Sequence, residues 1–256
     1  MRSPQSTSLV ARFIVPLALL AAWFASTVSG ALKPYQLASP QAVVAELIDL
    51  AARGELARDL LASITRVAAG FAIALVLALV LGSLVGASRA VERVLDPTLQ
   101  AVRAVPSLAW VPLILLWLGI GEPAKIALVA IGAFFPIYVS LHAAIRGVDR
   151  KLIEVAQVLG VRGLPLIARV LVPATLPALL VGARIGLTQA WLFLVAAELL
   201  AASRGLGSLL TEGQQIARTD EILVAILLFA LCGKLSELAM RALERRLTGW
   251  VDTVPA

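Results

Sequence analysis

The chain has 256 residues, of which 60% are hydrophobic and 15% are charged, and its formal net charge is +6. Soluble domains carry charges on roughly a quarter of their residues, so this composition excludes an ordinary water-soluble enzyme or binding module. It indicates a protein that lies largely within a lipid bilayer.

Long apolar segments predict an all-α membrane protein with about six transmembrane helices. A span requires about 20 mostly apolar residues, and within lipid only a helix satisfies every backbone group of a single segment. No repeat or linker divides the chain, so residues 1–256 are expected to form one membrane domain whose core covers about 60–245. The predicted spans are residues 13–30, 65–87, 105–120, 126–145, 179–201 and 222–242.

The first predicted span has some features of a signal peptide, because Arg2 and Arg12 precede its apolar run and small residues follow it. We expect it to be retained as a helix with its N-terminus in the cytoplasm. Of the 22 Lys and Arg residues, fifteen, including Arg103, fall on the N-terminal side of the predicted spans and seven on the other. By the positive-inside rule both termini are then cytoplasmic. The excess of basic over acidic residues therefore reflects the membrane topology and not nucleic-acid binding.

A short amphipathic helix is predicted between the first two spans. Ser39 can cap it and Pro40 can occupy its first position, a favoured pairing at a helix start. Val43, Leu47 and Ala51 contribute to an apolar face. Two interpretations stay open: a helix that lies on the outer membrane surface, or a short connector with no chemistry of its own.

Glycines and prolines in the next spans predict close packing and kinks. Gly82 and Gly86 are four residues apart, a spacing that suits close contact between helices. Pro106 and Pro112 flank the start of the third predicted span, and Pro136 interrupts the fourth. Proline kinks helices, so these positions are either hinges for a conformational change or kinks that the bundle tolerates.

No catalytic or metal site is predicted. His142 and Cys232 are each the only residue of their type, and no carboxylate stands at ligand spacing from His142. The sequence also contains no phosphate-binding loop and no paired nucleophile and base. The chain is therefore expected to bind no nucleotide or other cofactor itself.

A more polar stretch, residues 146–178, separates the fourth and fifth predicted spans and is expected on the cytoplasmic side. We predict a helix at 151–159 that Gly160 ends and a second short helix at 164–172 that Pro173 ends. Val155, Val158 and Leu159 form an apolar strip on the first helix. The pattern alone leaves two interpretations equally open: the strip docks on another protein, or it folds back on its own spans.

Residues in this stretch resemble the EAA loop of binding-protein-dependent ABC importer permeases. That loop carries E-A-A, a Gly four residues after the second Ala, and I-x-L-P after nine more, and the present chain departs from it only by substituting valines. The resemblance implies a type I ABC importer permease fold with a cytoplasmic coupling helix that inserts into a groove of the ATPase. The implied coupling residues are Glu154, Ala156, Val158, Leu159, Gly160 and Pro173.

Longer segments resemble one branch of that family, the importers of alkanesulfonates, taurine and nitrate. They include "RAVPSLAWVPLILLWLGIGEPAKIAL", "FFPIYVSLHAAIRGVDRKLIEVAQ" and "LVAAELLAASRGLGSLL". Within the branch, "FFPIY" and "IRGVDRKLIEVA" are most similar to aliphatic sulfonate permeases. The resemblance therefore favours aliphatic sulfonates as the solute, with taurine and nitrate as alternatives.

The same resemblance implies the partners and the location. The chain is expected to form a homodimer in the cell (inner) membrane, in contact with lipid, with two copies of an ABC ATPase subunit on the cytoplasmic side. A periplasmic or extracellular solute-binding protein would deliver the solute. ATP binds to the ATPase, so this chain is expected to be a non-catalytic subunit that carries no cofactor and no metal.

Polar residues on one face of the fifth predicted span are candidates for the translocation path. Their spacing of three and four residues places them on one side of a helix, and such groups usually face a bundle interior or water. An alternative is that the two charged members reach the membrane interfaces and the rest pack. Apart from Lys234, Arg184 is the only basic residue expected deep in a span. The candidates are Arg184, Thr188, Trp191 and Glu198, with Gln189 beside them and Val195 as the aliphatic member of the stripe.

Two other classes of function are less well supported. An ion-coupled secondary transporter predicts acidic residues at the middle of the membrane and an inverted repeat, and we find neither. A membrane-embedded enzyme predicts a nucleophile with a base or a set of metal ligands. Co-purification of an ATPase would separate the importer from both.

Overall fold

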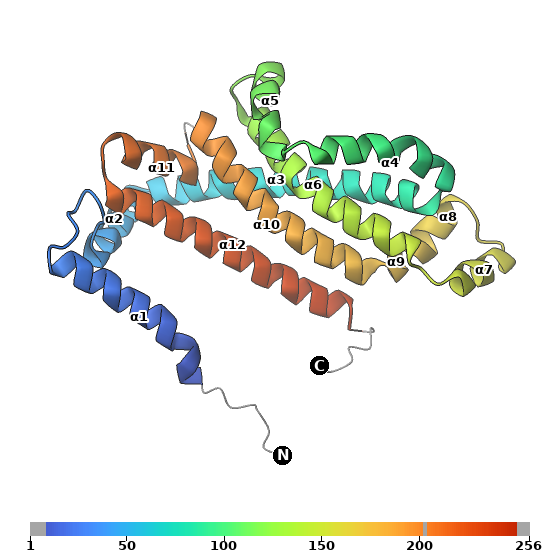
Figure 1. Ribbon diagram of the computed structural model, residues 1–256, viewed down its shortest axis with the longest axis horizontal. Coiled ribbons are helices and arrows are strands. Elements are labelled where there is room, and N and C mark those ends of the chain that lie inside the picture. Colours follow the sequence, from blue (N-terminus) through green and yellow to red (C-terminus); the bar gives the residue numbers. More distant parts are fainter. Residues whose placement is uncertain (1–8, 202–203, 250–256) are drawn as a thin grey trace, which may run out of the picture.

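The computed structural model describes residues 9–201 and 204–249, and the regular structure within them is helical (Figure 1). Long helices run along the molecule, and short ones connect them at both ends. In chain order the elements are α1 (Leu9–Val28), α2 (Pro40–Ala52), α3 (Glu55–Ala87), α4 (Arg89–Ala104), η1 (Ser107–Trp110), α5 (Val111–Leu118), α6 (Glu122–Arg146), α7 (Arg150–Val158), α8 (Leu164–Leu166), η2 (Ile167–Leu171), α9 (Val172–Ala174), α10 (Leu176–Ala201), α11 (Leu206–Gln215) and α12 (Thr219–Leu247).

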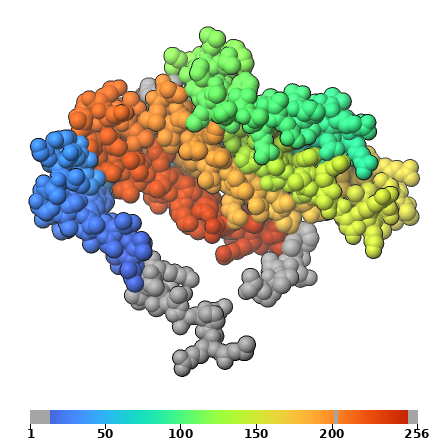
Figure 2. Space-filling view, viewed as in Figure 1, coloured from blue at the N-terminus to red at the C-terminus, as the bar shows by residue number. Residues whose placement is uncertain are grey.

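The core of the bundle consists of α3, α6 and α10, with α12 against α10 and α11. Its fully buried side chains include Leu128, Ile137 and Leu141 of α6 and Leu194 of α10. Many apolar side chains on the outer faces of α3 and α12 are exposed, as expected for helices that contact lipid. Figures 1 and 2 show an elongated molecule in which the long helices lie side by side.

Residue contacts define the directions of these helices. The start of α3 contacts the start of α6 through Arg66 and Glu122, and the ends of both helices meet where Gly86 approaches Ile145. The start of α3 also contacts the end of α10, because Arg66 binds Glu198. The helices α3 and α6 are therefore parallel to each other and antiparallel to α10.

Glycines allow the core helices to approach closely. A Cβ atom at Gly82 would lie 3.2 Å from the Leu141 side chain, and one at Gly86 would lie 2.9 Å from that of Ile145. The predicted packing role of these two glycines is confirmed. On α10, Gly186 faces the backbone carbonyl of Ala133, so the contact between α6 and α10 also depends on the absence of a side chain.

Replacing Gly186 with alanine is expected to destabilise the folded protein by about 1–3 kcal/mol, as overpacking generally does. The new methyl group would lie 2.8 Å from the Ala133 carbonyl oxygen, so α6 and α10 must separate. Thermal unfolding in detergent measures the effect. The matched control is Gly233→Ala on α12, where a Cβ meets nothing within 4 Å. Equal melting temperatures for the two variants would contradict the expectation.

Within the described residues, four helices are long and apolar enough to cross a bilayer: Glu55–Ala87, Glu122–Arg146, Leu176–Leu200 and Thr219–Leu247. They confirm the spans predicted at 65–87, 126–145, 179–201 and 222–242. The helix at the first predicted span is α1, whose described apolar part, Ile14–Val28, is shorter than a full crossing. The span predicted there stays a prediction.

The third predicted span, residues 105–120, is not one continuous helix. The chain instead forms a bent pair, Arg89–Ala104 and Ser107–Leu118, with 90° between its halves, and it counts as a fifth crossing only if the pair is one span. Pro106, which caps η1, stands in the break. The charges on α4 suggested a cytoplasmic connection, but α4 is an amphipathic helix that packs back along α3 (Figure 1).

The amphipathic helix α2 begins as predicted. Ser39 Oγ accepts a hydrogen bond from the Ala42 amide at 3.2 Å, and Pro40 is the first helical residue. Its buried face packs on α3 and α12. That face contains Val43 and a carboxylate, Glu46, which is only 5% exposed.

The polar stretch after α6 forms α7, Arg150–Val158, and the glycine at 160 ends it as predicted, with φ +79°. The predicted end of the second helix at Pro173 is wrong. Helical structure continues through α8, the π-helical η2 and α9 to Ala174, and the break before α10 is at Thr175. Proline stands in the first turn of α9, where its missing N–H is tolerated, and the π turn before it widens the helix.

Candidate functional site

The helix α7 lies at one end of the molecule, beyond the ends of the long helices (Figure 1). Of the residues in its predicted apolar strip, Val155 is 58% exposed, Val158 87% and Leu159 75%. The strip therefore does not fold back on the spans of its own chain. Ala156 is the buried residue of α7 and turns toward the rest of the protein.

The end of α7 has a defined backbone geometry. The amide of Gly160 donates to the Gln157 carbonyl at 3.1 Å and that of Val161 donates to the Ala156 carbonyl at 2.9 Å, the pair of bonds of a Schellman motif. A Cβ at Gly160 would meet nothing within 4 Å, so the positive φ and not crowding favours glycine here. This cap holds the exposed apolar residues at the tip of the loop. Glu154, another predicted coupling residue, pairs with Arg150 at 2.9 Å on the exposed side.

The residues of the predicted stripe on α10 lie in different surroundings. Arg184 donates to Glu244 of α12 at 3.1 Å, and the indole of Trp191 donates to Ser236 of α12 at 3.1 Å. These two residues attach α10 to α12 within one chain. Thr188 is exposed and donates only to a carbonyl of its own helix.

The last member of the stripe, Glu198, belongs to a buried cluster at the other end of α10. Its carboxylate is 0% exposed and contacts Arg66 Nη1 at 2.5 Å. The Arg66 guanidinium also donates to Glu122 through Nε at 2.6 Å and Nη2 at 2.7 Å. Lys125 contacts the same Glu122 carboxylate at 2.9 Å. Two cations and two carboxylates therefore join α3, α6 and α10.

This cluster also holds the turn that leads into α11. The Glu198 carboxylate accepts hydrogen bonds from Ser63 at 2.8 Å and from the Gly207 amide at 2.8 Å. Ser63 in turn accepts from the Leu206 amide at 2.9 Å, and Asp59 accepts from the Gly205 amide at 3.0 Å. Each buried polar group in the cluster thus has a partner, which is what makes its burial tolerable.

Sequence reasoning missed the cluster. The predicted span 65–87 contains Arg66 near its start, but no partner was predicted for this residue, and the segment that contains "SRGLG" was used for its resemblance to the importer family. The available signal was that both glycines of this segment, Gly205 and Gly207, closely follow an intramembrane carboxylate, Glu198. In the structure a Cβ at Gly207 would collide with the Glu198 side chain, so glycine is required for the amide to reach the carboxylate.

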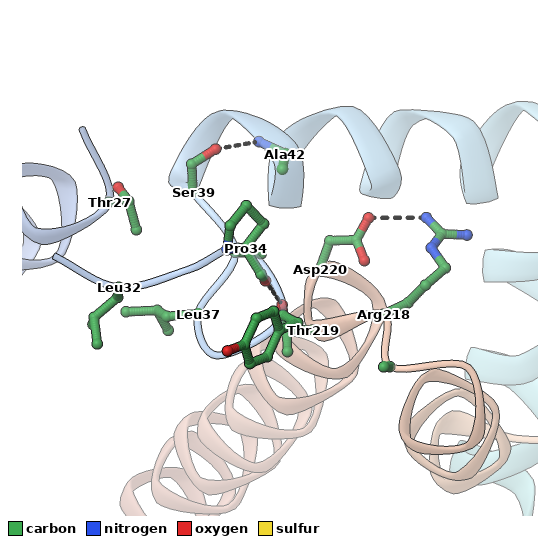
Figure 3. Close-up of a pocket in the computed structure, with 12 residues that line it drawn as sticks. Thr27, Leu32, Pro34, Leu37, Ser39, Ala42, Arg218, Thr219 and Asp220 are labelled. Atoms are coloured by element: carbon green, nitrogen blue, oxygen red, sulfur yellow. Dashed lines mark hydrogen bonds and ion pairs between the residues drawn. The ribbon is translucent and has the colours of Figure 1, made fainter. Parts of the chain in front are cut away.

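A pocket of about 660 Å³ lies between the α1–α2 connection and the α11–α12 turn (Figure 3). Thr219 donates to the Pro34 carbonyl at 2.6 Å across it, and Arg218 binds Asp220 at 2.9 Å and also Glu46. The hydrogen bond to Asp220, together with that to Glu46, raises the pKa of the Arg218 guanidinium above its ordinary value. These bonds attach the N-terminal helices to α12.

A second cavity, of about 330 Å³, lies where the end of α4 and η1 meet the middle of α6 and α10. Gln189, one of the predicted path residues, lines it, whereas the stripe residues Arg184, Trp191 and Glu198 do not. Arg103 also lines it, although the sequence placed this residue among the cytoplasmic segments. Because α4 returns along α3, its last turn lies beside the middle of the bundle and not at its end. The lining residues are Arg103, Ser107, Gly132, Phe135, Pro136, Val139, Ser140, Ile185, Gln189 and Phe193.

Among the described residues, no group of three or more His, Cys, Asp and Glu side chains could hold a metal ion. His142 stacks on Tyr138 with ring centroids 5.7 Å apart and lies 3.5 Å from Glu92. Cys232 is a buried free thiol. These residues take part in packing between helices.

Comparisons with known proteins agree with this arrangement. Residues 74–249 match the family described as the binding-protein-dependent transport system inner membrane component. The chain is 41% identical over 237 residues to an aliphatic sulfonates transport permease protein, SsuC, of Bacillus subtilis (strain 168), covering 93% of this chain and 86% of that one. It is 42% identical over 241 residues to SsuC of Escherichia coli (strain K12), covering 94% and 92%.

A taurine transport system permease protein, TauC, of Escherichia coli (strain K12) is 37% identical over 237 residues and covers 91% of this chain and 86% of its own. Among solved structures, an inward-facing conformation of the MetNI methionine ABC transporter superposes with a TM-score of 0.67. The match covers 75% of this chain and 95% of that one at 21% identity, so it establishes a likeness of fold alone.

Proposed function

The chain belongs to the family of binding-protein-dependent transport system inner membrane components, and from that premise we propose that it imports aliphatic sulfonates by alternating access. It is the non-catalytic permease subunit of an ABC importer of the sulfonate, taurine and nitrate branch, and it is a multi-pass protein of the inner membrane. This membership removes the secondary transporter and the membrane enzyme as alternatives.

The observation that supports the mechanism is the exposed apolar tip of α7. Val158 and Leu159 project beyond the bundle at 87% and 75% exposure, which suits residues that enter a groove on another protein. Permeases of this family work with an ATPase and a solute-binding protein. We assign the tip of α7 to the ATPase: ATP binding draws two ATPase subunits together, α7 moves with them, and the bundle changes from inward- to outward-facing.

The assembly we propose is a homodimer with two ATPase subunits below it and a binding protein above. Both termini are cytoplasmic in this arrangement, and α7 lies on the same side. The helix directions are compatible with it, because α3, α6 and α12 begin at the end of the bundle where α10 finishes. The helix α10 then runs outward and α12 returns the chain to the cytoplasm.

Growth of a deletion strain tests the solute. Cells that lack this gene are expected to lose growth on alkanesulfonates as the sole sulfur source while growing normally on sulfate. Taurine as a sulfur source and nitrate as a nitrogen source are tested in parallel. A defect only on taurine or only on nitrate would reassign the solute within the branch, and normal growth on all three would contradict the proposal. Complementation with the intact gene is the control.

A further inference from the structure

We propose that the cavity between α4, η1, α6 and α10 is a transient binding site for the transported anion, in which Arg103 binds the negative group. This proposal deepens the proposed function and rests on it, because it supposes that the chain conducts a small organic anion. It concerns the passage through the permease, which is separate from capture by the binding protein.

The cavity lies at the middle of the bundle. Phe135 and Pro136 are halfway along α6, and Gln189 is halfway along α10. Ionisable side chains at this depth are costly in lipid and usually face a bundle interior or a water-filled cavity on a solute pathway. Arg103 is at this level because α4 returns along α3.

Arg103 differs from the other basic residues that pack between helices. Arg66, Arg184 and Arg218 each contact a carboxylate. Arg103 is exposed, lines the cavity, and has neither an ion pair nor a hydrogen bond with any residue that the structure describes. None of the described residues that line the cavity is acidic. An anion that enters the cavity therefore meets a guanidinium whose charge is not already compensated.

The rest of the lining suits an alkanesulfonate. A sulfonate has three acceptor oxygens, and the hydroxyls of Ser107 and Ser140 and the amide of Gln189 are donors beside Arg103. Phe135 and Phe193 provide apolar surface for a short alkyl chain. The volume of about 330 Å³ is at the small end of the usual range for ligand sites, so it admits a small solute.

Uptake by the complete complex tests the role of Arg103. Replacing it with glutamine is expected to lower the rate of alkanesulfonate uptake at limiting solute by at least tenfold, while Arg103→Lys retains more of the rate because the charge remains. The matched control is Arg93→Gln on the same helix, whose side chain is exposed and does not line the cavity. All variants are compared at equal yields of assembled complex.

Occupancy of the cavity is measured separately by labelling a thiol. In a Cys232→Ala background, Ser140→Cys places a single reactive group in the lining. An excess of alkanesulfonate is expected to slow its reaction with neutral N-ethylmaleimide. The protection should disappear when Arg103→Gln is added and persist when Arg93→Gln is added.

The outcomes distinguish a failure of the proposed anion site from a failure of the proposed function. If the wild-type complex takes up alkanesulfonate but Arg103→Gln changes neither uptake nor protection, the anion site is wrong and the proposed function stands. If the wild type takes up taurine or nitrate instead, the solute assignment is wrong, and the labelling is repeated with that solute. Protection of Ser140→Cys that does not depend on Arg103 would overturn the role of the guanidinium in either case.

Discussion

Replacing Glu198 with alanine should cost the folded protein about 3–5 kcal/mol, the typical result of removing one partner from a buried ion pair. The substitution leaves the Arg66 guanidinium, only 5% exposed, with Glu122 as its remaining acid. It also removes the acceptor of the Gly207 amide and of the Ser63 hydroxyl. The turn into α11 thereby loses its side-chain hydrogen bond to α10, while Asp59 and Ser63 of α3 still accept from the Gly205 and Leu206 amides.

The yield of assembled protein and the midpoint of thermal unfolding in detergent measure this effect. The matched control is Glu237→Ala on α12, which breaks surface ion pairs with Lys234 and Arg241 and is expected to change the stability far less. Equal losses for the two variants would contradict the structural role of Glu198. A Glu198→Gln protein that assembles fully but fails to transport would instead favour the pathway role predicted from the α10 stripe.

Placing a charge at the tip of α7 should uncouple the permease from its ATPase without unfolding it. Val158→Asp is expected to weaken ATPase binding by about 2 kcal/mol or more, as for a central interface residue, which is roughly a 30-fold loss of affinity. Because Val158 is 87% exposed within the chain, the substitution should change the stability of the isolated permease by less than about 0.5 kcal/mol. Co-purification of a tagged ATPase and ATP-driven uptake measure the effect.

The control for this experiment is Val94→Asp, the same chemical change at a 73% exposed position on α4. It should leave ATPase binding unchanged. Gly160→Pro tests the same contact between α7 and the ATPase in another way. Proline cannot adopt φ +79°, so the C-terminal cap of α7 is lost. ATPase recovery equal to the wild type for both Val158→Asp and Gly160→Pro would show that α7 is not the docking element.

Local features were predictable because their causes lie within a few residues. Ser39 followed by Pro40 predicts a helix start from the chemistry of adjacent groups, and the structure has that cap. Gly160 predicts a helix end for the same reason, because only its own φ and two amides nearby are involved. Four of the long apolar runs predict spans, since the need to satisfy backbone groups in lipid acts on each segment separately.

Predictions failed where the path of the chain depends on contacts with distant residues. The segment at 105–120 is apolar enough to suggest a span, but its length does not reveal a 90° break at Pro106. Pro173 suggests a helix end, yet a π turn and packing carry the helix past it. The stripe on α10 has a correct helical spacing, but spacing alone does not tell which neighbouring helix each side chain meets.

The sequence by itself determined that this is an all-helical membrane protein with a loop helix that ends at Gly160 and carries an apolar strip, whereas the exposure of that strip came from the structure. The length of an apolar run, the conformation of a glycine and the spacing of residues are properties of short segments. They can be read without knowing which other segments pack against them. Only the tertiary structure decided that Glu198 pairs with Arg66, 132 residues earlier, and that Arg103 lies beside the middle of α6 and α10 with no partner among the residues that the structure describes. The physical reason is that the surroundings of a charge in a bundle depend on the direction and depth of every helix around it, and those follow from packing between distant parts of the chain.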